Sequence, residues 1–174
     1  MRWRLIDSIT EVSPGRSICG TASTNLPEEL FADHFPSFPV TPGVLLVEMA
    51  AQLSGKLIEA TVWEQKQLWV FPILSIVREA KFRTFVPPRV ELQIEASLSE
   101  LREESAICKA VVRHQGHRHA NMELLFVFDA EGATADGDRD FLEGYERKEF
   151  RRLKSPWKPS PATLRPVPTE GKDD

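Results

Sequence analysis

Residues 34–52 read HFPSFPVTPGVLLVEMAAQ, and the change of character within this stretch decides the fold. Three prolines between positions 36 and 42 exclude regular secondary structure in its first half and predict a stiff, ordered loop. From Pro42 the residues are almost all apolar, and a helical pattern continues to about Trp63. Thr41 suits the N-cap of this helix and Pro42 its first helical position. The sequence therefore predicts a long helix that begins directly at a rigid loop.

This helix carries apolar residues on nearly every side of its first three turns, which predicts a helix buried on most sides. Glu48 is the one charged residue in these turns. Burial disfavours the ionised form of a carboxyl group, so Glu48 is a candidate proton donor. Gln52 lies one turn later on the same helical face and is placed to orient that carboxyl group.

The segments on either side of the helix read mainly as strands. Apolar residues 5–12 and 17–22 flank the turn Ser13-Pro14-Gly15 and predict a hairpin, followed by a short helical turn at 27–31. After the helix, strands are predicted at 69–77, 78–86, 90–99, 105–113 and 120–128, with a turn at 114–117. One buried helix and about six antiparallel strands indicate an α+β domain, residues 1–128, in which the sheet wraps around the helix.

The composition changes after residue 128. Residues 129–174 form a charged, proline-rich C-terminal extension whose end is poor core-forming sequence. A helix is predicted over 141–154. Whether this helix docks on the domain or belongs to a loose extension stays open at this level.

The whole-chain composition excludes several classes of protein. The chain has 174 residues and a net charge of −4, which argues against a general nucleic-acid binder. Its longest uncharged run, 35–47, is too short to span a membrane, which requires roughly 20 apolar residues. No export signal opens the sequence, so we expect a cytoplasmic protein.

His34 and Glu48 form a candidate acid/base pair, because imidazole is a natural base near neutral pH and a shielded carboxyl group a natural acid. The first-turn amides of Gly43 and Val44 have no helical partner and lie at the positive end of the helix dipole, which makes a candidate oxyanion site. The alternative from the residues alone is a packed histidine and a structural acid.

The 34–52 stretch closely resembles the signature HFPxxPxxPGVLxxExxAQ of the FabZ/FabA-type beta-hydroxyacyl-ACP dehydratases. The Lys81-Phe82-Arg83 strand, the break at Pro87-Pro88 and the strands after it are similar to the rest of that family's domain, over residues 1–128. The resemblance implies a hotdog fold, a long central helix wrapped by a curved antiparallel sheet, and a homodimer as the functional unit. Whether dimers assemble further, into a trimer of dimers, stays open.

By this resemblance, His34 of one subunit faces Glu48 of the other across the dimer interface. Gly43 matches the oxyanion amide position, and Gln52 matches the helper on the helix. The implied reaction removes water from a beta-hydroxyacyl thioester carried on the phosphopantetheine of acyl carrier protein, without a metal or redox cofactor. A glutamate at position 48 resembles the branch that only dehydrates. The alternatives are a non-catalytic acyl-binding or partner-binding hotdog protein and a hotdog thioesterase.

A short basic segment follows the helix. Arg78, Lys81, Arg83 and Arg89 are opposed only by Glu79, a local charge of +3. Because acyl carrier proteins are acidic, this segment is a candidate docking surface. A strand edge guarded by charges explains the same residues equally well.

Two other groups of residues invite a chemical interpretation. His114, His117 and His119 surround a predicted turn and do not provide a four-ligand zinc set, so no metal site is predicted. Cys19 and Cys108 are far apart and outside any CxxC spacing, so we expect buried, reduced thiols.

Overall fold

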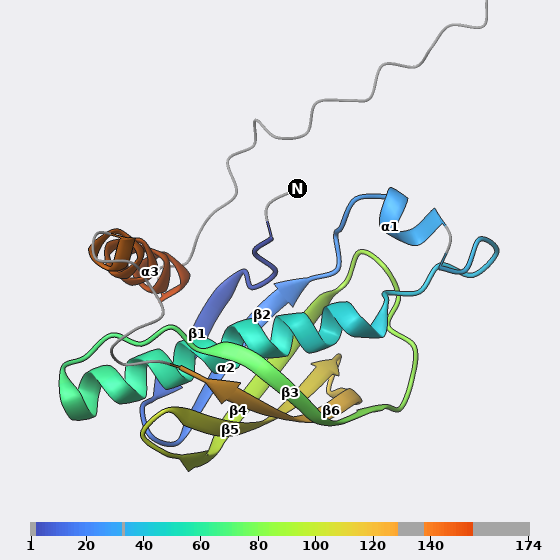
Figure 1. Ribbon diagram of the computed structural model, residues 1–174. Helices are drawn as coiled ribbons and strands as arrows, with labels where there is room; N and C mark the ends of the chain where they lie inside the picture. Colours follow the sequence, from blue (N-terminus) through green and yellow to red (C-terminus); the bar gives the residue numbers. More distant parts are fainter. Residues whose placement is uncertain (1–2, 33, 129–137, 155–174) are drawn as a thin grey trace, which may run out of the picture.

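The computed structural model describes residues 3–32, 34–128 and 138–154. The elements in chain order are β1 (Ser8–Ser13), β2 (Ser17–Ser23), α1 (Glu29–Ala32), α2 (Gly43–Lys66), β3 (Ile73–Phe82), β4 (Glu91–Leu101), β5 (Ser105–His114), β6 (His117–Val127) and α3 (Asp138–Lys154). The strands form one antiparallel sheet in the order β1-β2-β4-β5-β6-β3, and α2 lies along it (Figure 1). This is the helix-on-sheet arrangement of the hotdog fold that the sequence predicted.

Both predicted hairpins are present, and their turns explain why. Between β1 and β2, Gly15 has φ +76°, a conformation that favours glycine. Between β5 and β6, Gln115 and Gly116 have φ +49° and +78°, and two successive positive values match the twist of the flanking strands. Gly15 is also tied to the helix, because its amide donates to the Thr61 hydroxyl at 2.8 Å.

Helix α2 begins one residue later than predicted. Its N-cap is Pro42, and the cap makes no side-chain hydrogen bond, so the prediction of Thr41 as the N-cap is wrong. The Thr41 hydroxyl donates instead to the Pro87 carbonyl at 3.1 Å, and the Thr41 amide donates to the Val86 carbonyl at 2.8 Å. Thr41 therefore holds the loop before α2 against the segment after β3.

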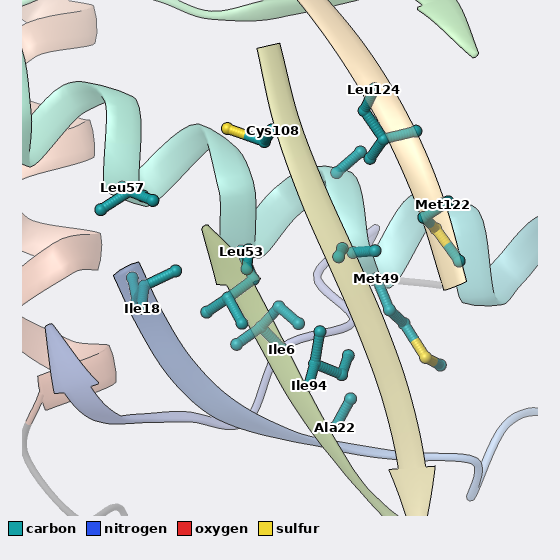
Figure 2. Packing of buried hydrophobic residues seen from close by; sticks show 14 of the residues in the cluster. Ile6, Ile18, Ala22, Met49, Leu53, Leu57, Ile94, Cys108, Met122 and Leu124 are labelled. Carbon is teal, nitrogen blue, oxygen red and sulfur yellow. The ribbon is translucent and has the colours of Figure 1, made fainter. Parts of the chain in front are cut away.

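The core lies between α2 and the concave side of the sheet. Figure 2 shows Met49, Leu53 and Leu57 of α2 pointing towards side chains from several strands. Leu53 and Leu57 are fully buried and belong to the same hydrophobic cluster as Ile18, Ile94, Cys108, Met122 and Leu124. Burial of this helix face supplies the largest favourable contribution to folding, at about 25 cal/mol per Å² of apolar surface.

Strand β3 differs from its prediction in two ways. The pattern predicted two strands, 69–77 and 78–86, whereas the structure has one, Ile73–Phe82. It is an outer strand, hydrogen-bonded only to β6, and most of its side chains are exposed on both faces in a single chain. Apolar side chains remain exposed here, with Ile73 at 60% and Ile76 at 51%. A strand without a buried face in one chain has no clean alternation, which is why its limits were misplaced.

The helix predicted over 141–154 is present as α3 and docks on the domain, whereas 129–137 and 155–174 of the predicted extension lie outside the described residues. It packs against β1, and two ion pairs tie it to the segment before β1 and to α2: Arg4 with Glu149 at 2.8 Å, and Lys56 with Glu146. Leu153 enters the core at 3% exposure. In the part of the chain that the structure describes, no helix is long and apolar enough to cross a bilayer.

Candidate active site

Glu48 lies in the second turn of α2 and is held by two donors on one oxygen. The Gln52 Nε2 donates to Glu48 Oε1 at 2.8 Å, and the Trp3 indole Nε1 donates to the same atom at 3.0 Å. The Gln52 side chain is itself fixed, because its Oε1 accepts the Leu5 amide at 2.9 Å. These contacts orient the Glu48 carboxyl group and leave Oε2 as the oxygen available to carry a proton.

The predicted role of Gln52 in orienting Glu48 agrees with this geometry, whereas the predicted burial of Glu48 does not. Glu48 is half-buried in the single chain. The amino-terminal segment around Trp3 covers it only in part, since the Trp3 side chain is 58% exposed. Trp3 is a site residue that the sequence did not point to, because it lies 45 positions from Glu48 and in no recognisable motif.

His34 is fixed by a reciprocal pair of contacts with Val40. The His34 Nδ1 lies 3.1 Å from the Val40 carbonyl oxygen, and the Val40 amide donates to the His34 carbonyl at 3.0 Å. A ring nitrogen that faces a carbonyl must carry hydrogen in order to bond with it. The proton is therefore on Nδ1, and the lone pair of Nε2 is free to act as a base.

The first turn of α2 provides the predicted amide donors. Hydrogen bonds within the described residues use neither the Gly43 nor the Val44 amide, and the first amide to be paired is that of Leu45, with the Pro42 carbonyl. A Cβ on Gly43 would lie 3.0 Å from the Phe82 ring, so only glycine fits against β3 here without a shift. Free amides at the start of a 24-residue helix can stabilise an oxyanion.

Two half-sites result. Glu48, Gln52 and Trp3 form one cluster, and His34 with the loop that carries it forms another. Among the described side chains, no hydrogen bond or ion pair joins His34 to Glu48 within one chain. The structure thus positions the Glu48 carboxyl group and the His34 imidazole separately on the same monomer.

The basic segment lies beside the His34 loop, although its members differ in their surroundings. Arg78 pairs with Glu123 at 3.2 Å and Lys81 with Glu79 at 2.7 Å. The exposed Arg83 and Arg89 make no ion pair with any carboxylate that the structure describes. The segment is held against the loop by the contacts of Thr41 and by an edge-to-face contact between the Phe38 and Phe85 rings, 5.9 Å apart.

His114, His119 and the two cysteines have neighbours that indicate a structural role. His114 Nδ1 lies 2.8 Å from the Glu91 carbonyl oxygen, and His119 Nδ1 lies 2.8 Å from the Thr84 hydroxyl. No metal-binding group of three or more His, Cys, Asp or Glu residues occurs in the described ranges. Burial raises the pKa of the Cys108 thiol to about 12, so it is a poor nucleophile. Cys19 is half-buried rather than buried as predicted.

Comparison with known proteins agrees with the sequence signature. The model of the FabA-like domain matches residues 1–121. The 3-hydroxyacyl-acyl-carrier-protein dehydratase FabZ of Clostridium acetobutylicum is 31% identical over 124 residues, which are 71% of this chain and 85% of the relative. The enzyme of the same name from Ligilactobacillus salivarius is 34% identical over 123 residues, 71% of this chain and 86% of the relative.

Solved structures share the fold at low sequence identity. The dehydratase heterocomplex ApeI:P from Xenorhabdus doucetiae superposes with a TM-score of 0.59 at 14% identity, covering 74% of this chain and 85% of that one. The protein smu.793 from Streptococcus mutans, bound to acetyl CoA, has a TM-score of 0.57 at 9% identity, covering 75% of this chain and 93% of that one. These matches confirm the hotdog fold.

Proposed function

Because this chain belongs to the FabA-like domain family, we propose that it dehydrates a beta-hydroxyacyl thioester to the trans-2-enoyl thioester, with the acyl group carried on acyl carrier protein. Such a hydro-lyase reaction belongs to the synthesis of fatty acids or related acyl products. The relatives that support this function are FabZ enzymes at 31% and 34% identity. Localisation in the cytoplasm stays a prediction from the sequence.

The proposed reaction uses one base, one acid and one oxyanion site. His34 Nε2 takes the proton from the carbon next to the thioester carbonyl. The Gly43 and Val44 amides stabilise the negative charge that develops on the carbonyl oxygen. Glu48 then protonates the departing beta-hydroxyl group, so that water leaves and a carbon–carbon double bond forms. The turnover leaves His34 protonated and Glu48 ionised, and one proton moved between them restores both groups.

The observation that carries this proposal is the hydrogen bonding of the His34 and Glu48 side chains. His34 has its Nδ1 committed to Val40, so its Nε2 is the basic atom. Glu48 has one oxygen saturated by Trp3 and Gln52, so its other oxygen is the acidic position. The proposed steps use only side chains and backbone amides of this protein. The phosphopantetheine belongs to the carrier protein.

We place the complete site in a homodimer. Strand β3 is an outer strand with one free edge in the described sheet, and an unpaired edge readily pairs with another strand. Exposed apolar side chains continue from it to the start of α2, including Phe82 at 50% and Val44 at 74% exposure. Pairing of β3 with its copy would cover this surface and bring the second chain to the half-sites. Further assembly into a trimer of dimers stays a prediction.

Mixed dimers test the composite site. We expect His34→Ala and Glu48→Gln each to lower kcat by roughly 10²- to 10⁴-fold. If each site combines His34 of one chain with Glu48 of the other, a dimer of the two variants has one site with both native groups. Co-expression in equal amounts should then restore about a quarter of the native activity, because about half of the dimers are mixed. No restoration would place both groups of one site in the same chain.

The activity itself is tested by the spectrum of the product. Incubation with a beta-hydroxyacyl thioester should generate the ultraviolet absorbance of a conjugated enoyl thioester, and His34→Ala should abolish it. Release of free thiol would indicate the hotdog thioesterase instead. Saturable binding of the thioester without either signal would indicate a non-catalytic acyl-binding protein.

For the carrier protein, we propose docking on the exposed basic residues next to the His34 loop. Arg83 and Arg89 carry most of this proposal, since Arg78 and Lys81 already pair with carboxylates. The Phe38–Phe85 contact places their segment against the loop that holds the base. An acidic carrier docked there would present its phosphopantetheine close to His34.

A further inference from the structure

A cavity of about 370 Å³ lies beside Glu48 and extends along α2. Four polar side chains of α2, Glu48, Gln52, Lys56 and Glu59, form one wall at helical spacing. Glu59 follows Glu48 by eleven positions, which correspond to roughly 16 Å along the helix axis. The cavity therefore leads away from the proposed acid along α2.

The far end of this cavity is lined by charged groups, two of which, Glu146 and Glu149, come from α3. Lys56 Nζ lies 3.0 Å from both carboxylate oxygens of Glu59 and also pairs with Glu146 of α3. Arg4 pairs with Glu149 at 2.8 Å and lies over the ring of Tyr145, 4.9 Å from its centroid. Glu146, Glu149 and Tyr145 are all α3 residues that line the cavity.

The charged end wall of the cavity changes which acyl chains bind there favourably. An alkyl chain end gains free energy when it leaves water for an apolar surface. Against Glu59 and the Lys56–Glu146 ion pair it would remove water from polar groups and return no hydrogen bond. A chain end with a hydroxyl or amide group can replace that water by bonding to the cluster.

Resting on the proposed function, we propose that the cavity beside Glu48 receives the acyl chain and that α3 selects chains with a hydrogen-bonding group at the distal end. The Lys56–Glu146 pair is the specificity determinant. It couples the end wall on α2 to the docked C-terminal helix.

Gly55 provides a way to test the path of the chain. It lines the cavity two turns after Glu48, about 10 Å along the helix, and a Cβ at this position would meet no atom within 4 Å beyond its own stretch of helix. Gly55→Leu should therefore fill the cavity between Glu48 and the charged wall without disturbing the fold. Short acyl chains that end before Gly55 should be unaffected.

The test compares three pantetheine thioesters: 3-hydroxybutyryl, 3-hydroxydecanoyl and 3,10-dihydroxydecanoyl. For the native protein we expect kcat/KM to be roughly tenfold higher for the dihydroxy chain than for the alkyl chain of equal length. The double variant Lys56→Met/Glu146→Leu, which replaces the ion pair between α2 and α3 by apolar side chains, should reduce this ratio to about 1 or below. Glu143→Leu on α3, whose residue pairs with Arg147 and does not line the cavity, is the matched control and should keep the native ratio.

The outcomes separate the two proposals. Gly55→Leu should lower kcat/KM for both ten-carbon chains by about tenfold or more and leave the four-carbon chain within about twofold. A native preference for the alkyl chain, an unchanged ratio in the double variant, or equal effects of Gly55→Leu on all three thioesters would overturn the inference while the dehydratase function stands. If no thioester is dehydrated, the proposed function fails and the inference fails with it. Circular dichroism and the melting temperature establish that each variant is folded.

Discussion

Gln52 donates a hydrogen bond to Glu48 across 2.8 Å, one helical turn away, while its own oxygen is held by the Leu5 amide. The glutamine therefore positions the proposed acid rather than reacting itself. We expect Gln52→Met to lower kcat by about tenfold, with KM nearly unchanged, because the lost hydrogen bond would stabilise the Glu48 carboxylate that forms as the proton is donated. Gln65→Met, on an exposed part of the same helix, is the matched control. A rise in KM at constant kcat would show that Gln52 binds substrate instead.

Arg83 and Arg89 give a prediction for the carrier protein. Reversing both charges, Arg83→Glu/Arg89→Glu, should raise KM about tenfold for a substrate on acyl carrier protein and leave KM for the pantetheine thioester unchanged. The KM difference should shrink as salt is added, because screening weakens exposed charge interactions. Arg102→Glu, at the β4–β5 turn, should behave like the native protein. Equal effects on both substrates would argue against docking at this surface.

Replacing two glycines by alanine should change the free energy of unfolding in opposite directions. A Cβ on Gly20 would lie 2.5 Å from the Ser8 carbonyl oxygen and 2.9 Å from Leu53, so Gly20→Ala must displace backbone and should destabilise by about 1–3 kcal/mol. A Cβ on Gly55 meets nothing within 4 Å, so Gly55→Ala should stabilise helix α2 by about 0.5–1 kcal/mol. Urea unfolding measures both values. The reverse order would mean that the packing around β1 and β2 is looser than described.

Glu59 predicts a pH dependence of stability. Burial raises its pKa to about 8 against the counteracting charge of Lys56, from 4.5 in an ordinary setting. Between pH 4.5 and pH 8 the folded state binds the Glu59 proton more tightly than the unfolded state does. The resulting contribution to the free energy of unfolding is complete below about pH 4.5 and is lost as the pH rises through 8. Each unit of the difference corresponds to about 1.4 kcal/mol.

The measurement is the free energy of unfolding at pH 5 and pH 8. We expect the native protein to lose more stability than Glu59→Gln over this interval, because the amide cannot ionise. Glu64→Gln, an exposed neighbour on α2, should retain the native dependence. Equal slopes for the native protein and Glu59→Gln would contradict the raised pKa.

The two cysteines predict selective labelling. Burial raises the pKa of Cys108 to about 12 and its side chain is fully buried, whereas Cys19 is only half-buried, although its pKa is also raised by burial. Iodoacetamide at pH 8 should therefore modify Cys19 first, as followed by peptide mass spectrometry. In urea both should react at similar rates. Rapid labelling of native Cys108 would show that strand β5 opens readily.

The sequence predicted the features that depend on local periodicity. The spacing of Glu48 and Gln52 on a helix follows from 3.6 residues per turn, and the proline-bounded loop fixed the neighbourhood of His34. Trp3 was missed because its contact with Glu48 joins residues 45 positions apart. The docking of α3 was undecided because it rests on pairs such as Lys56–Glu146, 90 positions apart. Thr41 was misassigned because a tertiary acceptor, the Pro87 carbonyl, competes with the helix for its hydroxyl.

The position of α3 also affects how many chains can associate through the edges of the sheet. The sheet has two outer strands, β1 and β3, and α3 packs against β1 (Figure 1). A sheet with two equally accessible edges can add copies at both ends and grow into a fibre. With the C-terminal helix on one outer strand, β3 is left as the edge open to a second copy. In the proposed dimer, association through strand edges would close at two chains, and α3 would limit growth into an open-ended polymer.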